Sequence, residues 1–433
     1  MIPPLLRQVT FRRFWTGQVV SLFGDQVSLF AVPLTAVLVL HAGPEQMGLL
    51  TAAGLLPSLL FSLLAGSLVD RRGQRRRTML GADLIRAGLM VSIPVAYACG
   101  VLVLPQLYAV AFAVGICDVF FAVAYSTLFV SVVPPADYLA GQSLLNGSRA
   151  MSFVVGQSAA GLLVAAFTAP GAIVLDALSF LGSAFALKRI DPAEPVTSGE
   201  GHGSLAAGIT FIRRSATIRA ALRATATVNF FTLAFNAIFI LYATRSLHVR
   251  PAVLGFVLGA GAVGALLGSV VTGRIARRIG VGRAFALGCV AFPAPLALAP
   301  LAAGQTWMVL GALFLAEFGS GLGVMILDIS IGAIFATEIP DRLRARVSGA
   351  YRSVNYGIRP LGALTGGFLG GALGLRPTLW LAVVGGCTCA LWLVRSPILA
   401  LRDRGEDRSP ATGSGRQRAD AASGSATSGA AAS

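Results

Sequence analysis

Residues 66–77 read Gly-Ser-Leu-Val-Asp-Arg-Arg-Gly-Gln-Arg-Arg-Arg, a short basic stretch between two apolar segments that are each long enough to cross a bilayer. Arginine is costly to place in hydrocarbon, so the stretch is expected to form a loop at one membrane face. Gly66 is expected to allow two helices to approach closely, and Gly73 to supply the turn. Because basic residues gather on cytoplasmic loops, we expect this loop to be cytoplasmic.

The stretch belongs to a repeat within the chain. In the second copy Arg277 stands where Asp70 stands in the first, so only the first half carries this carboxylate. An internal repeat of several helices is typical of secondary transporters, whose halves move about a shared site near the midplane. A shift of 207 residues aligns His41 with His248, Pro44 with Pro251, Gly48 with Gly255, Gly54 with Gly261, Gly66 with Gly273 and Gly73 with Gly280, and a shift of 206 aligns Pro134 with Pro340, Gly156 with Gly362 and Gly161 with Gly367.

The composition is that of a membrane protein. Of 433 residues, 55% are apolar and only 12% are charged, and the mean hydropathy is +0.77. The net charge of +16 could suggest a nucleic-acid partner, but the basic residues form short clusters between long apolar runs. Membrane topology explains such clusters, so the lipid bilayer and not nucleic acid is the expected partner.

Apolar runs and turn residues together predict an all-α membrane protein with twelve transmembrane helices in two pseudo-symmetric six-helix halves. The arginine-rich ends of these helices place both termini in the cytoplasm. The helices are expected at 14–40, 46–69, 77–99, 105–132, 139–168, 171–190, 219–245, 252–275, 282–302, 306–336, 344–372 and 376–397. The predicted organisation is an N-terminal half (1–190), a cytoplasmic linker with an amphipathic helix (191–218), a C-terminal half (219–398) and a disordered cytoplasmic tail (399–433).

The basic stretch resembles the signature loop between the second and third helices of the major facilitator superfamily, with Gln74 as the main departure. Residues 21–33 and 208–219 resemble its enterobactin-exporter and macrolide-efflux branch. The resemblance extends over about residues 10–398. It implies a fold that works by alternating access, with a gating loop formed by Gly66, Asp70, Arg71, Gly73, Arg75 and Arg76.

The resemblance also implies that Asp70 contacts the start of the eleventh helix, near Arg344 and Arg346, when the cavity faces outward. The free N–H groups and the dipole of that helix would attract a carboxylate. In the alternative, the loop is only a topological anchor, in which the arginines matter and Asp70 does not.

Polar residues at helical spacing point to a central cavity, because in lipid a polar group needs a partner or water. Stripes of this kind fall on the first, fourth, seventh and tenth helices, which by resemblance line the cavity. The predicted cavity residues are Gln18 and Asp25, Asp118 and Tyr125, Asn229 and Asn236, and Glu317 and Asp328.

Each of these acids has a structural alternative. Arg86 in the third helix or Arg359 in the eleventh could neutralise Asp25, Asp118 or Glu317 in a static ion pair. Asp176 in the sixth helix is interpreted as structural, and Asp83 with Arg86 as a brace for the basic loop. Serine and threonine on the stripes could instead bond their own helix backbone.

The sequence offers no sign of an enzyme. It contains no Gly-x-x-x-x-Gly-Lys nucleotide loop, and its three histidines cannot form a hydrolase site. The five cysteines lie in apolar segments without metal-ligand spacing, so neither a metal nor a cofactor is expected.

These features predict a secondary transporter that exports an amphipathic small molecule, a drug-like compound or secondary metabolite, in exchange for protons. A carboxyl group in a low-dielectric cavity can exchange a proton near neutrality. The fourth helix lacks the arginine of proton-coupled drug antiporters, which weakens a direct transfer of their mechanism. The alternatives are a siderophore or lysophospholipid carrier, an uncoupled uniporter and, more remotely, a non-transporting membrane sensor. A monomer is expected.

Overall fold

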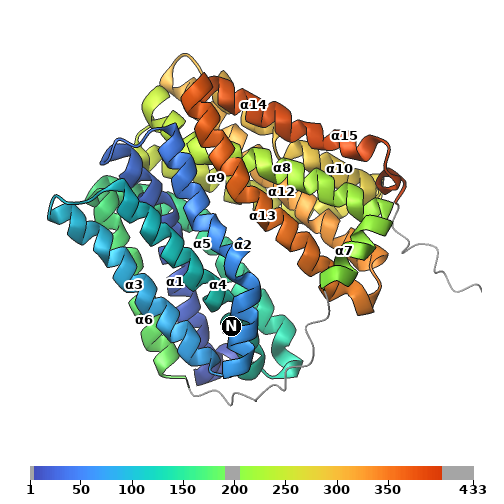
Figure 1. Ribbon diagram of the computed structural model, residues 1–433, viewed down its shortest axis with the longest axis horizontal. Coiled ribbons are helices and arrows are strands. Elements are labelled where there is room, and N and C mark those ends of the chain that lie inside the picture. Colours follow the sequence, from blue (N-terminus) through green and yellow to red (C-terminus); the bar gives the residue numbers. More distant parts are fainter. Residues whose placement is uncertain (1–3, 191–204, 402–433) are drawn as a thin grey trace, which may run out of the picture.

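The computed structural model describes residues 4–190 and 205–401, and within these ranges every regular element is a helix (Figure 1). The first half contains η1 (Pro4–Arg7), α1 (Val9–Leu38), α2 (Pro44–Arg72), α3 (Arg75–Ala98), α4 (Leu104–Val132), η2 (Pro135–Asp137), α5 (Tyr138–Phe167) and α6 (Ala169–Lys188). The second half contains α8 (Ala216–Leu241), the π-helical turn η3 (Tyr242–Ser246), α9 (Pro251–Ile279), α10 (Val281–Ala291), η4 (Ala294–Ala297), α11 (Leu298–Leu301), α12 (Thr306–Glu338), α13 (Asp341–Leu373), α14 (Leu375–Cys387), η5 (Thr388–Ala390), α15 (Leu391–Val394) and η6 (Pro397–Ala400).

Ten helical segments of the described chain are long and apolar enough to cross a membrane, which confirms ten of the twelve predicted spans. α2 and α13 occupy the positions of the other two spans. They have 29 and 33 residues, and at about 1.5 Å per residue each exceeds the roughly 30 Å hydrocarbon core of a bilayer.

Two spans that were predicted as continuous helices are interrupted. Within 282–302 the α-helix ends at Ala291, because Pro293 and Pro295 cannot donate backbone hydrogen bonds. Within 376–397 it ends at Cys387, where the hydroxyl of Thr388 donates to the carbonyl of Gly385 at 2.6 Å and competes with the helical pattern.

The predicted repeat is visible in the backbone. His41, after α1, and His248, after α8, both have positive φ angles, 51° and 53°. In both turns the N–H of the residue after the histidine donates to the carbonyl six residues earlier, at 2.8 and 2.9 Å. Gly73 and Gly280, which end α2 and α9, also share a positive φ, which glycine adopts at little cost. Gly73 therefore supplies the predicted turn.

The two halves meet at the end of the bundle that carries His41 and His248, which we call the histidine end. There α2 packs against α13, and α5 against α9. A Cβ added to Gly48 would lie 2.8 Å from the Cα of Gly367, and one added to Gly161 would lie 2.9 Å from the Cα of Gly255. The repeat relates these two contacts to each other, so equivalent glycines of the two halves bring helix backbones together at two places.

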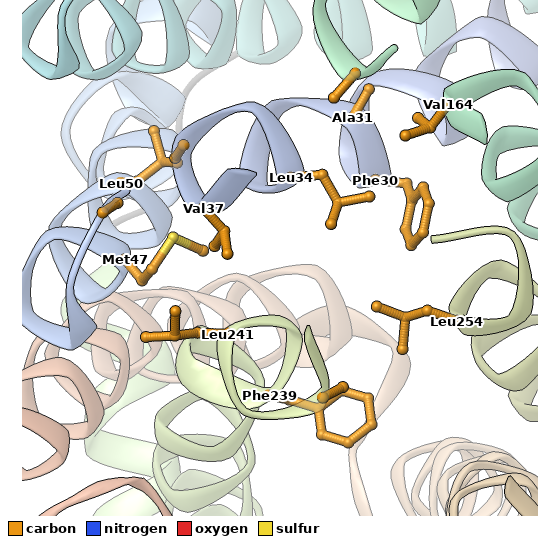
Figure 2. Packing of buried hydrophobic residues seen from close by; sticks show 14 of the residues in the cluster. Phe30, Ala31, Leu34, Val37, Met47, Leu50, Val164, Phe239, Leu241 and Leu254 are labelled. Carbon is orange, nitrogen blue, oxygen red and sulfur yellow. The ribbon is translucent and has the colours of Figure 1, made fainter. Parts of the chain in front are cut away.

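The opposite end, which carries Arg75 and Arg274, is called the arginine end. The largest cluster of buried apolar side chains joins both halves near the histidine end. Figure 2 shows Phe30 and Leu34 of α1 across from Phe239 of α8 and Leu254 of α9. Nearer the arginine end the core divides into two clusters, one confined to the first half and one to the second. The apolar core therefore closes the bundle at the histidine end only.

The outer surface of the bundle is apolar. On α6, Val174, Leu178, Leu181 and Phe185 form an exposed stripe at helical spacing, between 38% and 56% exposed. Neighbouring residues on the inner face of the same helix are fully buried. An exposed apolar band of this kind is the surface that lipid covers.

The predicted amphipathic helix forms as α7 (Leu205–Arg214). It packs against the start of α13, where a Cβ on Gly208 would lie 2.4 Å from the carbonyl oxygen of Arg346. Ile212 is buried, whereas Ile209 is 51% exposed. Residues 191–204 of the predicted linker and the tail from 402 onward lie outside the described residues, so the predicted domain boundaries stay a prediction.

Candidate functional site

A cavity of about 810 Å³ lies between the two halves, a size suited to a drug-like molecule. Most of its lining is apolar and includes Phe153, Phe239 and Phe292. Its polar lining residues are Asp25, Gln26, Ser28, Thr51, Asp118, Gln157, Asp176, Thr232, Asn236, Glu317 and Ser320.

Four of the eight predicted cavity residues line this space. They are Asp25 of α1, Asp118 of α4, Asn236 of α8 and Glu317 of α12. Each comes from one of the four helices on which the polar stripes were found. Glu317 lies against Gly261 of α9, where an added Cβ would approach its Oε2 to 3.5 Å.

The other four predicted residues lie away from the cavity lining. Gln18 is buried within the first half, and the ring of Tyr125 stacks on Phe14 with 5.4 Å between centroids. Asp328 is exposed nearer the arginine end of α12. Asn229 faces α13, as described below.

Arg86 of α3 forms an ion pair with Asp118, with 2.7 Å between Nη1 and Oδ1. Its Nη2 binds Asp83, which is fully buried. The guanidinium also lies over the rings of Phe121 and Phe180, with its central carbon 4.5 and 4.3 Å from their centroids. Arg86 is thus 3% exposed and is held by two carboxylates on two helices.

Arg359 of α13 makes a different kind of contact. Its Nε donates to the Oδ1 of Asn229 at 3.1 Å. The Nδ2 of Asn229 donates to the Oδ1 of Asn355 at 3.1 Å, and one turn away the hydroxyls of Thr225 and Tyr351 are 2.6 Å apart. These hydrogen bonds join α8 to α13 within the second half. Among the described residues, no ion pair joins Arg359, Asp25 or Glu317 to an oppositely charged group.

Asp176 lies at the cavity lining, whereas the sequence analysis interpreted it only as a structural residue of the sixth helix. Gly24 of α1 makes this possible, because an added Cβ would lie 2.4 Å from the Oδ1 of Asp176. The same oxygen accepts a hydrogen bond from Ser179 at 3.1 Å. The absence of a side chain at Gly24 on α1 thus leaves space for the carboxylate of Asp176 on α6. The glycine beside Asp25 was visible in the sequence, but its partner on α6 was not.

Gln157 of α5 is a second lining residue that the polar stripes did not include. Its Nε2 donates to the Oε1 of Gln26 at 3.0 Å. Thr232 of α8 also lines the cavity, and its hydroxyl has no hydrogen-bond partner among the described residues, so it does not bond its own helix.

The basic loop is fastened to the first half. Nη1 of Arg75 donates to the hydroxyl of Ser131 at 3.5 Å, and Nη1 of Arg76 donates to the carbonyl of Ile190 beyond α6. The side chains of Asp70 and Arg71 lie outside the described part of the structure.

The expected close helix contact at Gly66 is wrong for this conformation. A Cβ added there would meet no atom of the described chain within 4 Å. The physical reason is that Gly66 lies near the arginine end, where the two halves have separate cores.

The family model of the Major Facilitator Superfamily matches residues 14–360 and 224–427. The multidrug efflux pump Tap of Mycobacterium tuberculosis is 31% identical over 405 residues, which cover 87% of this chain and 90% of that protein. A pump of the same name from Mycolicibacterium fortuitum is 27% identical over 379 residues, with 82% and 88% covered.

Solved structures share the fold at low sequence identity. The nucleoside transporter NupG superposes with a TM-score of 0.71 at 12% identity and covers 89% of this chain and 98% of its own. A bacterial homologue of the iron transporter ferroportin, in an inward-facing state, gives 0.69 at 16% identity, with 90% and 99% covered.

Proposed function

This chain belongs to the major facilitator superfamily, and we propose that it is a secondary transporter of the cell membrane that exports amphipathic, drug-like molecules. The observation that carries the proposal is the cavity between the two halves, which combines apolar walls with carboxylates from both sides. The similarity to multidrug efflux pumps along most of the chain supports export as the direction.

Alternating access follows from the way the two halves meet. The apolar core and the two glycine contacts close the histidine end, while separate cores leave the halves independent near the arginine end. A rocking motion would break the glycine contacts and bring the arginine ends together. We place the arginine end and both termini in the cytoplasm, in accordance with the basic loops. The described conformation is then the one that admits substrate from the cytoplasm.

Protons are the coupling ion in this proposal. Asp25 of the first half and Glu317 of the second face the cavity, and neither forms an ion pair with another described residue. A carboxylate in this position can bind either a proton or a substrate group, so the two would exclude each other. Exchange of one for the other across the membrane is antiport. The protein acts as a monomer in this account, since one chain encloses the whole cavity.

Accumulation of a fluorescent amphiphile in cells that lack their own efflux pumps tests the proposal. Cells that express the protein should retain less ethidium than cells with an empty vector, and a protonophore should abolish the difference. Equal retention for a panel of cationic, neutral and anionic amphiphiles would overturn the transport function. If the dye instead equilibrates across the membrane faster in expressing cells than in empty-vector cells, and a protonophore does not change that rate, the protein would be an uncoupled uniporter.

A further inference from the structure

Each half of the bundle carries an exposed aromatic ring with a guanidinium group on its face, near the arginine end. In the first half the guanidinium carbon of Arg189 lies 3.9 Å from the ring centroid of Phe185, at the end of α6. In the second half the guanidinium carbon of Arg223 on α8 lies 5.1 Å from the ring centroid of Trp392 on α15. Phe185 is 56% exposed and Trp392 is 45% exposed, so both pairs lie on the outer surface.

The internal repeat relates these two arrangements. The shift of 207 residues also aligns the two rings with each other and two cations at the same end of each half, all of them exposed. The aligned pairs are Phe185 with Trp392, Arg12 with Arg219 and Lys188 with Arg395. The topology of a membrane protein accounts for cations at this end, but not for guanidinium groups that stack on exposed rings in both halves.

The groups of the second half are held in place by further contacts. Nε1 of Trp392 donates to the hydroxyl of Thr227 at 3.1 Å, which fixes the indole ring beside Arg223. Nη1 of Arg219 donates to the carbonyl oxygen of Arg213, near the end of α7. The ring and the two cations are therefore positioned by the fold.

No described acid neutralises these cations. The ion pairs found within the described chain are those of Arg86 and Arg344. Arg219 and Arg223 lie four residues apart on one face of α8, a spacing at which like charges repel each other. An anion bound between them would relieve this repulsion.

The surface beside each ring is apolar and faces lipid. α6 and α15 lie at opposite edges of the bundle (Figure 1). The exposed stripe on α6 ends at Phe185, and Leu391 and Val394, next to Trp392, are 71% and 66% exposed. Aromatic rings in such positions lie at the level of the lipid headgroups, where the phosphate groups of the lipids are also found.

We propose that these two surfaces bind anionic phospholipids, one in each half, in the leaflet at the arginine end. This inference goes beyond the transport function and does not depend on it, because it requires only that the helices span a bilayer. The lipid phosphate accepts hydrogen bonds from the cations, and the acyl chains lie along the apolar surface of α6 or α15. The first site is formed by Arg12, Phe185, Lys188 and Arg189, and the second by Arg219, Arg223, Trp392 and Arg395.

Native mass spectrometry of the full-length protein in a neutral detergent tests the proposal. The probes are dioleoyl phosphatidylglycerol, which is anionic, and dioleoyl phosphatidylcholine, which has no net charge, added at equal concentration. Two phosphatidylglycerol molecules should bind with a preference of about 5-fold or more, since one arginine near a membrane surface attracts an anionic lipid by about that factor. Equal binding of the two lipids would overturn the proposal.

The soluble headgroup distinguishes a lipid from a free phosphate ester. Glycerophosphoglycerol at the same concentration as the lipid should leave both binding events in place, because it lacks the acyl chains that contact the apolar surface. If it abolishes the binding of phosphatidylglycerol, the acyl chains contribute nothing and the assignment to a lipid is wrong.

Variants locate the second site. Arg219→Gln combined with Arg223→Gln should remove one of the two preferential binding events. Arg277→Gln combined with Arg278→Gln is the matched control, because it removes two exposed arginines from the same end of the same half, on α9. This control should keep both events. An equal loss in the two double variants would indicate a general attraction by charge and contradict the site.

The first site has its own variant. Arg12→Gln combined with Arg189→Gln should remove the other binding event and leave that of the second half. Combining these two substitutions with those at Arg219 and Arg223 should abolish the preference for phosphatidylglycerol. If the variant of the first half removes no binding event, the repeat does not carry a second site and the proposal of one site in each half is wrong.

Fluorescence quenching tests the second site with all arginines intact, so it applies even if the arginine variants do not fold. In a variant with Trp15, Trp307 and Trp380 replaced by phenylalanine, Trp392 is the remaining tryptophan. Brominated phosphatidylglycerol should quench it at least about 3-fold more than brominated phosphatidylcholine at the same mole fraction, and high salt should reduce the difference. Equal quenching by the two lipids would contradict the site.

Discussion

Arg86 on α3 binds Asp118 on α4 across the first half, with 2.7 Å between Nη1 and Oδ1. This contact separates the acids of the cavity into two kinds. Asp118 has a fixed positive partner, as the static ion-pair alternative required, whereas no described cationic group lies within ion-pair distance of Asp25 or Glu317. We therefore assign proton exchange to Asp25 and Glu317 and a mainly structural charge to Asp118.

Removal of Arg86 should destabilise the first half. Arg86→Leu leaves the fully buried Asp83 without its partner, and breaking a buried pair in this way typically costs about 3–5 kcal/mol. Thermal unfolding of the purified protein should show a clearly lowered melting temperature. The double variant Arg86→Leu with Asp83→Asn should recover part of the loss. A single variant as stable as the wild type would show that the pair is not needed for folding.

A larger side chain at Gly161 should open the histidine end. In Gly161→Leu the new side chain would overlap the backbone at Gly255, since even a Cβ would lie 2.9 Å from its Cα. Spin labels on the histidine ends of α5 and α9 should report a longer distance than in the wild type. Gly88→Leu is the matched control, because a Cβ at Gly88 meets nothing within 4 Å. The same distances in both variants would argue against the close contact of α5 with α9 at Gly161 and Gly255.

The prediction for Asp70 concerns the conformation in which the halves meet at the arginine end. Asp70→Asn should leave expression intact, favour the conformation open at the arginine end and slow turnover more than it weakens substrate binding. A contact between Asp70 and the start of α13 that forms in only one conformation would shift the populations of the two conformations by about 5-fold to 150-fold. Cross-linking between the turn at Gly73 and the start of α13 should therefore fall in the variant. An unchanged yield together with normal transport would leave the loop as a topological anchor only.

The orientation of the chain can be read from cysteine accessibility. A cysteine introduced at position 41, in a background where the five native cysteines are replaced, should react with a membrane-impermeant maleimide added outside intact cells. A cysteine at position 76 should react only after the membrane is permeabilised. The opposite pattern would invert the proposed layout, and with it the assignment of this conformation as open to the cytoplasm.

The sequence predicted those features that repeat. The histidine turns, the turn at Gly73 and the glycines that later form the two contacts between halves all appeared as aligned pairs. Local backbone demands and close helix contacts restrict the residue type at a position, so they leave a mark in the sequence.

The sequence could not tell which neighbour a polar face meets. Asn229 and Asn236 lie seven residues apart on one face of α8, about 10 Å along the axis, yet only Asn236 reaches the cavity. Asn229 meets Asn355 of α13 instead. Asp176 was interpreted as structural and not as a cavity residue for the converse reason, because its position beside the cavity depends on Gly24 of another helix. Helical spacing defines a face, but packing decides what that face contacts.

Transport in sealed vesicles tests the central claim most directly. Purified protein reconstituted in liposomes should accumulate ethidium against its gradient when a proton gradient is imposed, and a protonophore should stop the uptake. Asp25→Asn should be inserted in equal amount and lose gradient-driven uptake, while Asp328→Asn should keep it. If the wild type accumulates no more dye than empty liposomes, or if Asp25→Asn transports normally, the account of a proton-coupled exporter with its proton site at Asp25 is contradicted.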